Sequence, residues 1–191
     1  MYKRKRFLLI VLVCIMMVNS TVTVSAAMKE LDVTAYRQEK QYWCWAAAAR
    51  MAGKYKYPAS TVVQGQIVAH VKGSSLIDEP ANIFETVNAA EYVTNDTMEL
   101  SSTDFVKWDW DHVVLSIDNN YPIIALVNKN GSGHYYVICG YNPTTERIMV
   151  IDPSDAQRYT CSWEEFNDGT WSHDSRPHKY TIYFDTYWRA Q

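Results

Sequence analysis

Four consecutive alanines, Ala46 to Ala49, directly follow the segment Trp43-Cys44-Trp45, in which a cysteine is flanked by two tryptophans. Alanine has the highest helix propensity and a small side chain, so the run predicts a central helix that other segments approach closely. Cys44 then stands at the helix N-terminus, where unpaired N–H groups and the helix dipole favour the thiolate. The thiolate is the nucleophilic form, so this position suits covalent catalysis. The alternative is a small buried hydrophobic residue, which is what most free cysteines are.

The first 27 residues have the pattern of a secretory signal peptide. Lys3 to Arg6 are basic, Phe7 to Val18 are apolar, and Val24-Ser25-Ala26 offers a cleavage site with small residues. The apolar run is short compared with the roughly 20 residues of a membrane span. We therefore expect a protein secreted by a bacterium, extracellular or associated with the cell wall, with no stable membrane anchor once the signal is cleaved.

Removal of residues 1–27 leaves 164 residues, which carry 14 basic and 21 acidic side chains and a net charge of −7. A chain of this length buries a sizeable core, so we expect residues 28–191 to form one domain. The negative charge argues against nucleic acid and against an anionic membrane as a partner, because both need clustered positive charge.

Three cysteines remain in residues 28–191, namely Cys44, Cys139 and Cys161. Export permits disulfides, and an odd number of cysteines leaves at least one thiol free. If two of them are bridged, we favour Cys139 with Cys161, which leaves Cys44 free. The sequence leaves this bridge open, because it does not fix the geometry that a disulfide requires.

After a polar lead-in at residues 28–37, the first half of this segment has the apolar spacing of helices. We expect one helix from Cys44 to about Tyr55, ended by Tyr57-Pro58; a second with Thr61 and Gln64 as its capping box, ended by Gly73; a third opened by Pro80, with Ile83, Phe84, Val87 and Tyr92 facing inward; and a fourth from about Asp109 to Asn119.

From Asn119 onward the apolar runs are short, rich in β-branched and aromatic residues, and separated by turn residues. The expected strands are Ile123 to Val127, His134 to Tyr141, Arg147 to Ile151, Tyr159 to Ser162 and Lys179 to Trp188, with a helical turn from Trp163 to Phe166. Helices followed by strands predict an α+β domain with the helices packed on an antiparallel sheet. The Cys44 helix and the sheet then face each other across a cleft.

A cysteine nucleophile needs a nearby imidazole, and the imidazole needs a third group that fixes its tautomer. Four of the five histidines fit surface or packing roles; these are His70, His112, His173 and His178. His134 differs, because it opens a predicted strand directly after the turn residues 130–133. Its side chain there points toward the core at the solvent end of the strand. His134 is the predicted general base.

Asp152 closes the next predicted strand, 18 residues after His134, and precedes Pro153. If the two strands pair through the turn at Asn142-Pro143, the start of one lies beside the end of the other. His134 and Asp152 are then neighbours. An aspartate before proline also commonly initiates a turn, and one side chain can do both.

Acyl transfer also needs hydrogen-bond donors for the oxyanion of the tetrahedral intermediate. The backbone N–H of Cys44 is one candidate. Gln38, six residues upstream, can fold back over the helix start and offer its side-chain amide as the second. Gln41 is closer in sequence but leaves less chain for that turn.

Together these segments resemble the papain-like cysteine peptidases. The motifs are Gln38-x5-Cys44-Trp45-Ala46, Pro122-Ile123-Ile124, Gly133-His134-Tyr135-Tyr136-Val137-Ile138-Cys139-Gly140-Tyr141 and Ile151-Asp152-Pro153. Two bacterial branches are most similar: the peptidases that trim double-glycine leaders from bacteriocins, and the avirulence-effector type with its Trp-Cys-Trp-Ala-Ala setting. The resemblance spans about residues 36–166.

The resemblance implies a papain-like α+β fold in which the Cys44 helix packs against the C-terminal sheet. It also implies a Cys-His-Asp triad of Cys44 as nucleophile, His134 as general base and acid and Asp152 as orienting residue, with Gln38 as oxyanion donor. We expect a monomer that hydrolyses a peptide or protein substrate without a cofactor. This sequence carries its own signal peptide, unlike the exporter-linked branch, and has no obvious self-processing site, unlike the effector branch.

Two other functions stay open. The same triad could act on cell-wall stem peptides or form isopeptide bonds, or the scaffold could be a non-catalytic module. The intact set of four residues argues against a decayed enzyme. A metal site built from His173, Asp174 and His178 is discounted, because their spacing across Pro177 matches no common ligand pattern.

Overall fold

The structure is a computed structural model that describes residues 28–104 and 109–184; the predicted signal peptide lies outside the described residues. In chain order the elements are β1 (Lys29–Glu30), α2 (Cys44–Lys56), α3 (Gln64–Lys72), α4 (Ile83–Val93), β2 (Leu100–Asp104), α5 (Trp110–Asp118), β3 (Ile123–Lys129), β4 (Ser132–Asn142), β5 (Arg147–Asp152), β6 (Gln157–Ser162), α6 (Trp163–Asp168) and β7 (His178–Phe184). Most helices precede most strands, and the predicted α+β class is confirmed.

All pairings of the sheet are antiparallel, and strands β3 to β6 follow one another as hairpins. Its strand order is β2-β7-β3-β4-β5-β6, and β1 pairs with the far end of β4. The β3–β4 hairpin closes through Asn130 and Gly131, which both have positive φ, at 54° and 85°. An Asn-Gly pair in this conformation matches the twist of the flanking strands and fixes their register.

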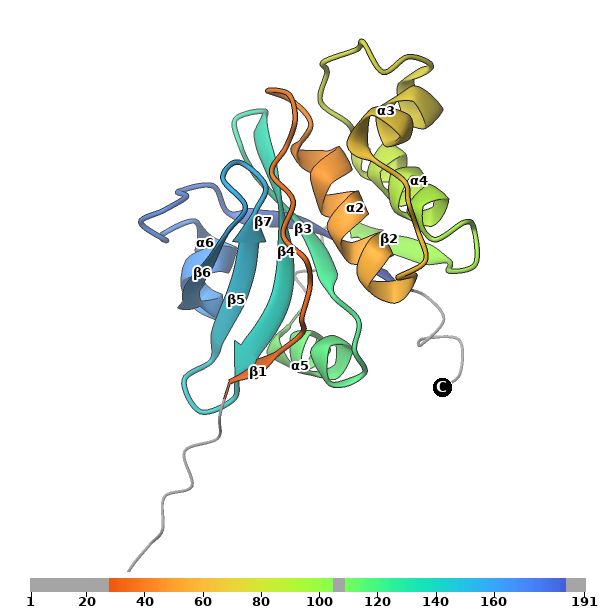
Figure 1. Cartoon of the computed structure of the whole chain (residues 1–191). Helices are drawn as coiled ribbons and strands as arrows, with labels where there is room; N and C mark the ends of the chain where they lie inside the picture. Colours follow the sequence, from red (N-terminus) through yellow and green to blue (C-terminus); the bar gives the residue numbers. More distant parts are fainter. Residues whose placement is uncertain (1–27, 105–108, 185–191) are drawn as a thin grey trace, which may run out of the picture.

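Helix α2 lies between the sheet and the pair α3 and α4, as Figure 1 shows, and it contacts all three. Ala46 to Ala49 are fully buried, as the alanine run predicted. On its α4 side, a Cβ added to Gly53 would lie 2.7 Å from the Val93 side chain, so this glycine permits the close approach of the two helices. Helix α2 thus packs closely against both of its neighbouring layers, and Cys44 is its first residue.

Two predicted helix starts are wrong. Helix α3 begins after Val63, whose N–H donates to the Gln66 side chain, so the box expected at Thr61 lies two residues too early. Helix α4 begins after Asn82 rather than at Pro80, because Asn82 and Glu85 form reciprocal hydrogen bonds there. Phe84, expected to face inward, is 69 % exposed, because the buried face of α4 carries Ile83, Thr86 and Ala90 instead.

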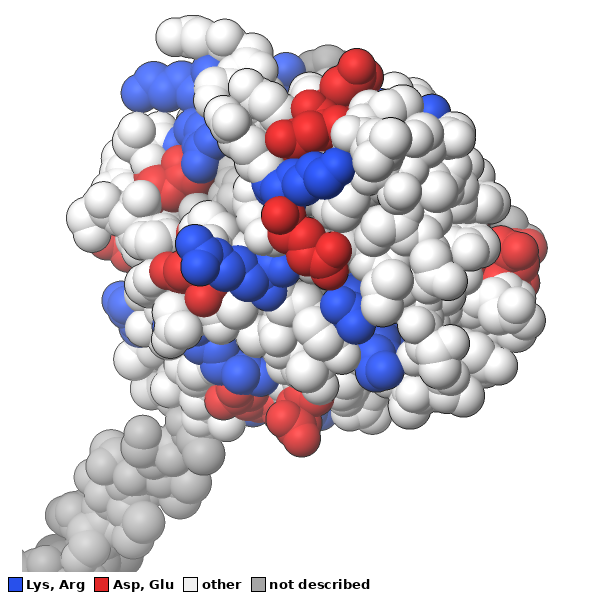
Figure 2. All heavy atoms as spheres, turned by 45° about the horizontal axis from the view of Figure 1, so that its top comes forward, with Lys and Arg blue, Asp and Glu red and all other residues white. Residues whose placement is uncertain are grey.

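Two further differences concern the strands. Strand β2 was not predicted, although it pairs along its length with β7 at the edge of the sheet. The last strand, β7, begins at His178, one residue before the predicted start, and continues to Phe184, the last described residue; residues 185–188 of the predicted span lie outside the described part. Within residues 28–104 and 109–184, the helices are all too short or too polar to cross a membrane. On the face in Figure 2, acidic and basic side chains are interspersed.

Candidate active site

Cys44 is the first residue of α2, so its backbone N–H has no acceptor within the helix. The preceding residue, Trp43, gives no side-chain cap, and the first turn contains no acidic residue. No acidic side chain of the first turn therefore offsets the positive end of the helix dipole. Both neighbouring indoles are buried, and they donate to the backbone oxygens of Ile77 (2.9 Å) and Glu79 (3.1 Å), which fixes the helix start.

His134 stands near the start of β4. Its Nε2 atom lies 2.8 Å from Asp152 Oδ1, and the Cys44 side chain lies close enough to the ring to raise the pKa of His134. Because Nε2 faces Asp152, Nδ1 is the nitrogen left for the thiol. The side chains of His134 and Asp152 are only 11 % and 4 % exposed. The structure thus brings Cys44, His134 and Asp152 into one chain of contacts.

The charges of this group support one another. Burial by itself lowers the pKa of His134, but its hydrogen bonds to Asp152 and Cys44, together with their negative charges, raise that pKa to about 9. Burial opposes ionisation of Asp152, yet the hydrogen bond and charge of His134, with a hydrogen bond from His173, hold its pKa well below the usual range. At neutral pH the arrangement favours an imidazolium between a carboxylate and the thiol.

A β-bulge puts Asp152 on the correct face of the sheet. From the turn upward, β4 and β5 pair as Tyr141 with Ile148 and Gly140 with Met149, and then the register shifts so that Ile138 pairs with Val150. Continued by two residues, the shifted register sets Asp152 opposite Tyr136, on the face that Tyr136 shares with His134. Without the bulge Asp152 would lie opposite a residue of the other face.

Gln38 lies in the loop before α2, beside the end of β5. Its backbone N–H donates to Pro153 O at 2.7 Å, which ties this loop to the residue after Asp152. Its side-chain Nε2 donates to Lys40 O at 2.9 Å and to Gln41 O at 2.6 Å, while its Oε1 is buried without a partner among the described residues. The amide hydrogens therefore face loop carbonyls, and the oxyanion role of Gln38 stays a prediction.

A groove of about 420 Å³ opens beside Cys44. Its lining is largely apolar or aromatic and includes Trp45, Pro80, Ile83, Phe84, Leu126, Tyr135 and Tyr180. The exposed Phe84 that departs from the sequence prediction is part of this wall, as are Gly131 and Gly133 of the β3–β4 hairpin. The site therefore combines a thiol with a cleft suited to an extended apolar segment.

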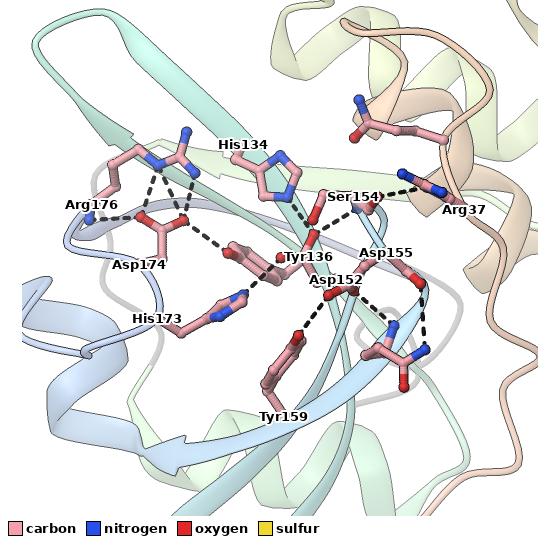
Figure 3. Close-up of polar contacts among 12 residues, drawn as sticks. Arg37, His134, Tyr136, Asp152, Ser154, Asp155, Tyr159, His173, Asp174 and Arg176 are labelled. Atoms are coloured by element: carbon pink, nitrogen blue, oxygen red, sulfur yellow. Dashed lines mark hydrogen bonds and ion pairs between the residues drawn. The ribbon is translucent and has the colours of Figure 1, made fainter.

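One residue of the site was missed by sequence reasoning. His173, assigned above to a surface or packing role, has its Nε2 atom 2.9 Å from Asp152 Oδ2 (Figure 3). The second histidine of the discounted metal set, His178, is buried, and its Nδ1 atom lies 2.9 Å from Asn167 Oδ1. No sequence signal marked His173, since it lies in an irregular loop 21 residues after Asp152.

The two other cysteines of the described segment are buried and are not bridged. The optional disulfide between Cys139 and Cys161 is therefore not formed. Burial raises the pKa of Cys139 to about 11 and that of Cys161 to about 12, so both thiols stay protonated. Cys44 is the partly exposed thiol of this segment.

With this geometry established, the comparisons define the class of protein. The Peptidase_C39 like family matches residues 30–177, and the chain belongs to that family. No curated protein sequence matches the chain.

Three solved structures share the fold. A putative C39-like peptidase from Bacillus anthracis is 12 % identical, with a TM-score of 0.59 over 83 % of this chain and 97 % of that one. Xylellain, a cysteine protease from Xylella fastidiosa, is 10 % identical, with a TM-score of 0.57 over 86 % and 88 %. A double glycine motif protease from an AMS/PCAT transporter, solved in complex with the leader peptide, is 17 % identical, with a TM-score of 0.53 over 81 % and 93 %. The fold is that of papain-like C39 peptidases, as predicted.

Proposed function

We propose that this protein is a cysteine peptidase that hydrolyses peptide bonds through Cys44, His134 and Asp152. The observation that carries the proposal is that the Cys44 thiol lies near the His134 ring, which contacts the Asp152 carboxylate at 2.8 Å, beside an open groove. A buried structural cysteine needs neither a histidine partner nor access to a groove. Membership of the Peptidase_C39 like family supports the same conclusion.

In the proposed reaction, His134 Nδ1 takes the thiol proton and Cys44 Sγ attacks the carbonyl carbon of the scissile bond. The imidazolium then gives its proton to the leaving amine, and the C–N bond breaks to leave a thioester. Water attacks the thioester, with His134 as the base, and releases the acid and the free thiol. Asp152 holds the proton on Nε2 throughout and stabilises the imidazolium. The Cys44 N–H supplies one oxyanion donor.

We assign the second oxyanion donor to Gln38, whose backbone is anchored to Pro153 O. This role requires that Nε2 exchange one of its two loop carbonyls for the oxyanion when substrate binds. The exchange keeps the number of hydrogen bonds that Nε2 donates constant.

The substrate in this proposal is a peptide or protein segment with apolar residues, because the groove wall is largely apolar and aromatic. One structural neighbour is a protease that was solved with a leader peptide, which is consistent with a peptide ligand in this fold. The pattern of residues 1–27 supports export, so we place the reaction outside the cytoplasm, in a single domain of residues 28–191.

The test is to express the full-length chain in a bacterium, determine the N-terminus of the purified product by intact mass, and incubate it with a diverse peptide library that includes cell-wall stem peptides. Mass spectrometry of the products gives the cleavage sites. Cys44→Ala is expected to abolish cleavage, and His134→Ala to be nearly as severe. Cleavage that persists in Cys44→Ala would exclude the proposed chemistry, and products found only from stem peptides would move the substrate class to the cell wall.

A further inference from the structure

The Asp152 carboxylate is held between two imidazoles. His134 Nε2 contacts Oδ1 at 2.8 Å, and His173 Nε2 contacts Oδ2 at 2.9 Å (Figure 3). The Ser154 N–H also donates to Oδ1, at 2.7 Å. Among the residues that the structure describes, His173 supplies the one hydrogen bond of Oδ2. The two carboxylate oxygens therefore have different partners: Oδ1 contacts His134, the proposed base, and Oδ2 contacts His173.

The ring of His173 is itself fixed by aromatic packing. It stacks on Tyr159 of β6, with ring centroids 4.0 Å apart and an interplanar angle of 28°. Trp171 packs beside it at 4.7 Å. The Tyr159 hydroxyl donates to Asp155 Oδ2 at 2.6 Å, which holds the stacking partner to the loop after Asp152. A side chain on an irregular loop is thus given a defined orientation toward Asp152.

The loop next to His173 is tied down as well. Asp174, the following residue, accepts a hydrogen bond from the Tyr136 hydroxyl at 2.9 Å and forms an ion pair with Arg176 at 2.7 Å. Burial and the nearby carboxylates keep the pKa of Tyr136 well above its usual value, so the phenol remains a donor. The Tyr136 ring also packs against both His134 and His173, at 4.8 and 6.5 Å.

We propose that His173 is a positioning residue for the proposed peptidase reaction: its hydrogen bond to Oδ2 holds the Asp152 carboxylate in the orientation that keeps Oδ1 on His134. Two donors on Oδ1 and one on Oδ2 define the plane of the carboxylate. With the Oδ2 donor removed, the carboxylate can rotate toward water and weaken its bond to His134. The inference rests on the proposed function, since it assigns His173 a part in that same reaction.

The charged and titratable groups around His173 come from several elements. Asp152 lies on β5 and Tyr159 on β6. Tyr136 and His134 both lie on β4, and His134 contacts the other oxygen of the Asp152 carboxylate. The Asp174–Arg176 pair follows on its own loop, and Asp155 acts through Tyr159. Because His173 has many neighbours, its own titration is a poor readout. The titration of His134 reports directly on the orientation of Asp152.

Two variants separate the hydrogen bond from the packing. His173→Gln keeps an N–H donor at nearly the position of Nε2 but removes the ring. His173→Phe keeps a ring that can stack on Tyr159 and Trp171 but removes the donor. The full chain carrying each variant is compared with the wild type by histidine NMR titration, with His134→Gln used to assign the His134 signals, and by thermal unfolding to confirm the fold.

His173→Phe is expected to lower the pKa of His134 by about 1 pH unit, equivalent to about 1.4 kcal/mol. It should also lower kcat/KM on a cleaved peptide by about tenfold, the low end of what an outer hydrogen-bond partner contributes to an orienting network. His173→Gln should retain the His134 titration. An unchanged His134 titration in His173→Phe, or an equal shift in both variants, would overturn the proposal. The NMR result does not require peptide cleavage, so failure of the positioning role is distinguishable from failure of the peptidase assignment.

Discussion

Replacement of Asp152 by asparagine tests the electrostatic core of the proposed site, because it removes one charge and almost no volume. The Ser154 N–H donates to Oδ1 at 2.7 Å, so the asparagine must place its carbonyl oxygen at that position. The same oxygen then still accepts from His134 Nε2. The tautomer of the base is preserved. The asparagine NH2 group then faces His173 Nε2, so the variant loses the negative charge and the hydrogen bond that His173 donates to Oδ2.

The magnitude follows from the pKa of His134, which is about 9 in the fold against an ordinary value of 6.5. The difference of about 2.5 pH units corresponds to about 3 kcal/mol in favour of the imidazolium. Cys44 contributes part of it, so we assign the Asp152 charge about 1 to 2 pH units. Because the proposed reaction needs the imidazolium to give its proton to the leaving amine, destabilising it should lower kcat/KM by roughly 10- to 100-fold.

The assay is the pH dependence of kcat/KM on a cleaved peptide. The imidazolium is lost as pH rises through the folded-state pKa, so the alkaline limb of the wild type should lie near pH 9. In Asp152→Asn it should move down by about 1 to 2 pH units. A large loss of rate with an unmoved alkaline limb would refute this electrostatic role and indicate that Asp152 supports only the fold of the loop.

Three further outcomes are expected. Gln38→Ala should lower turnover by roughly 100- to 1000-fold and leave alkylation of Cys44 nearly unchanged, because alkylation forms no oxyanion; a selective loss in Gln41→Ala instead would show that the other glutamine is the donor. Iodoacetamide should label Cys44 at mildly acidic pH, and peptide mapping should find the two buried cysteines unlabelled. A Cys44 that does not react would support a purely structural cysteine. Asp174→Asn should lower the melting temperature at pH 7 but not near pH 2, because the ion pair with Arg176 holds the Asp174 pKa below its usual value despite burial, and this stabilisation is lost as the pH falls below about 4; an equal loss at both pH values would contradict it.

The fold could be predicted wherever local chemistry and burial agree. The alanine run specifies a slim buried helix, and the Asn130-Gly131 pair specifies the β3–β4 hairpin. The expectation for Phe84 was wrong because apolar spacing alone assigned it to the core, whereas the buried face of α4 carries Ile83, Thr86 and Ala90 and Phe84 lines the groove. Strand β2 is stabilised by pairing with β7, some 80 residues later in the chain. No local sequence pattern predicts a pairing between such distant segments.

The candidate site shows the same limit on a smaller scale. Cys44 and His134 each follow a local signal, a helix start and a glycine-rich turn, so both could be found from the sequence. His173 follows none. Its contact with Asp152 depends on stacking between an irregular loop and Tyr159, and tertiary contacts of this kind have no periodicity in the chain.

The pairing of His134 with Asp152 was predicted from a simple hairpin, but the structure needs one more feature to achieve it. In an unbroken register Asp152 would face away from His134, and the shift between Ile138 and Gly140 turns it back. The segment that includes β1 supports this shift. The N–H of Leu31, the residue after β1, donates a hydrogen bond at 2.7 Å to the carbonyl oxygen of Cys139, which lies between Ile138 and Gly140. A Cβ at Gly140 would lie 2.7 Å from Lys29 O, so glycine is what lets β1 come that close. The orientation of the proposed catalytic aspartate thus depends on a backbone contact at the opposite end of β4.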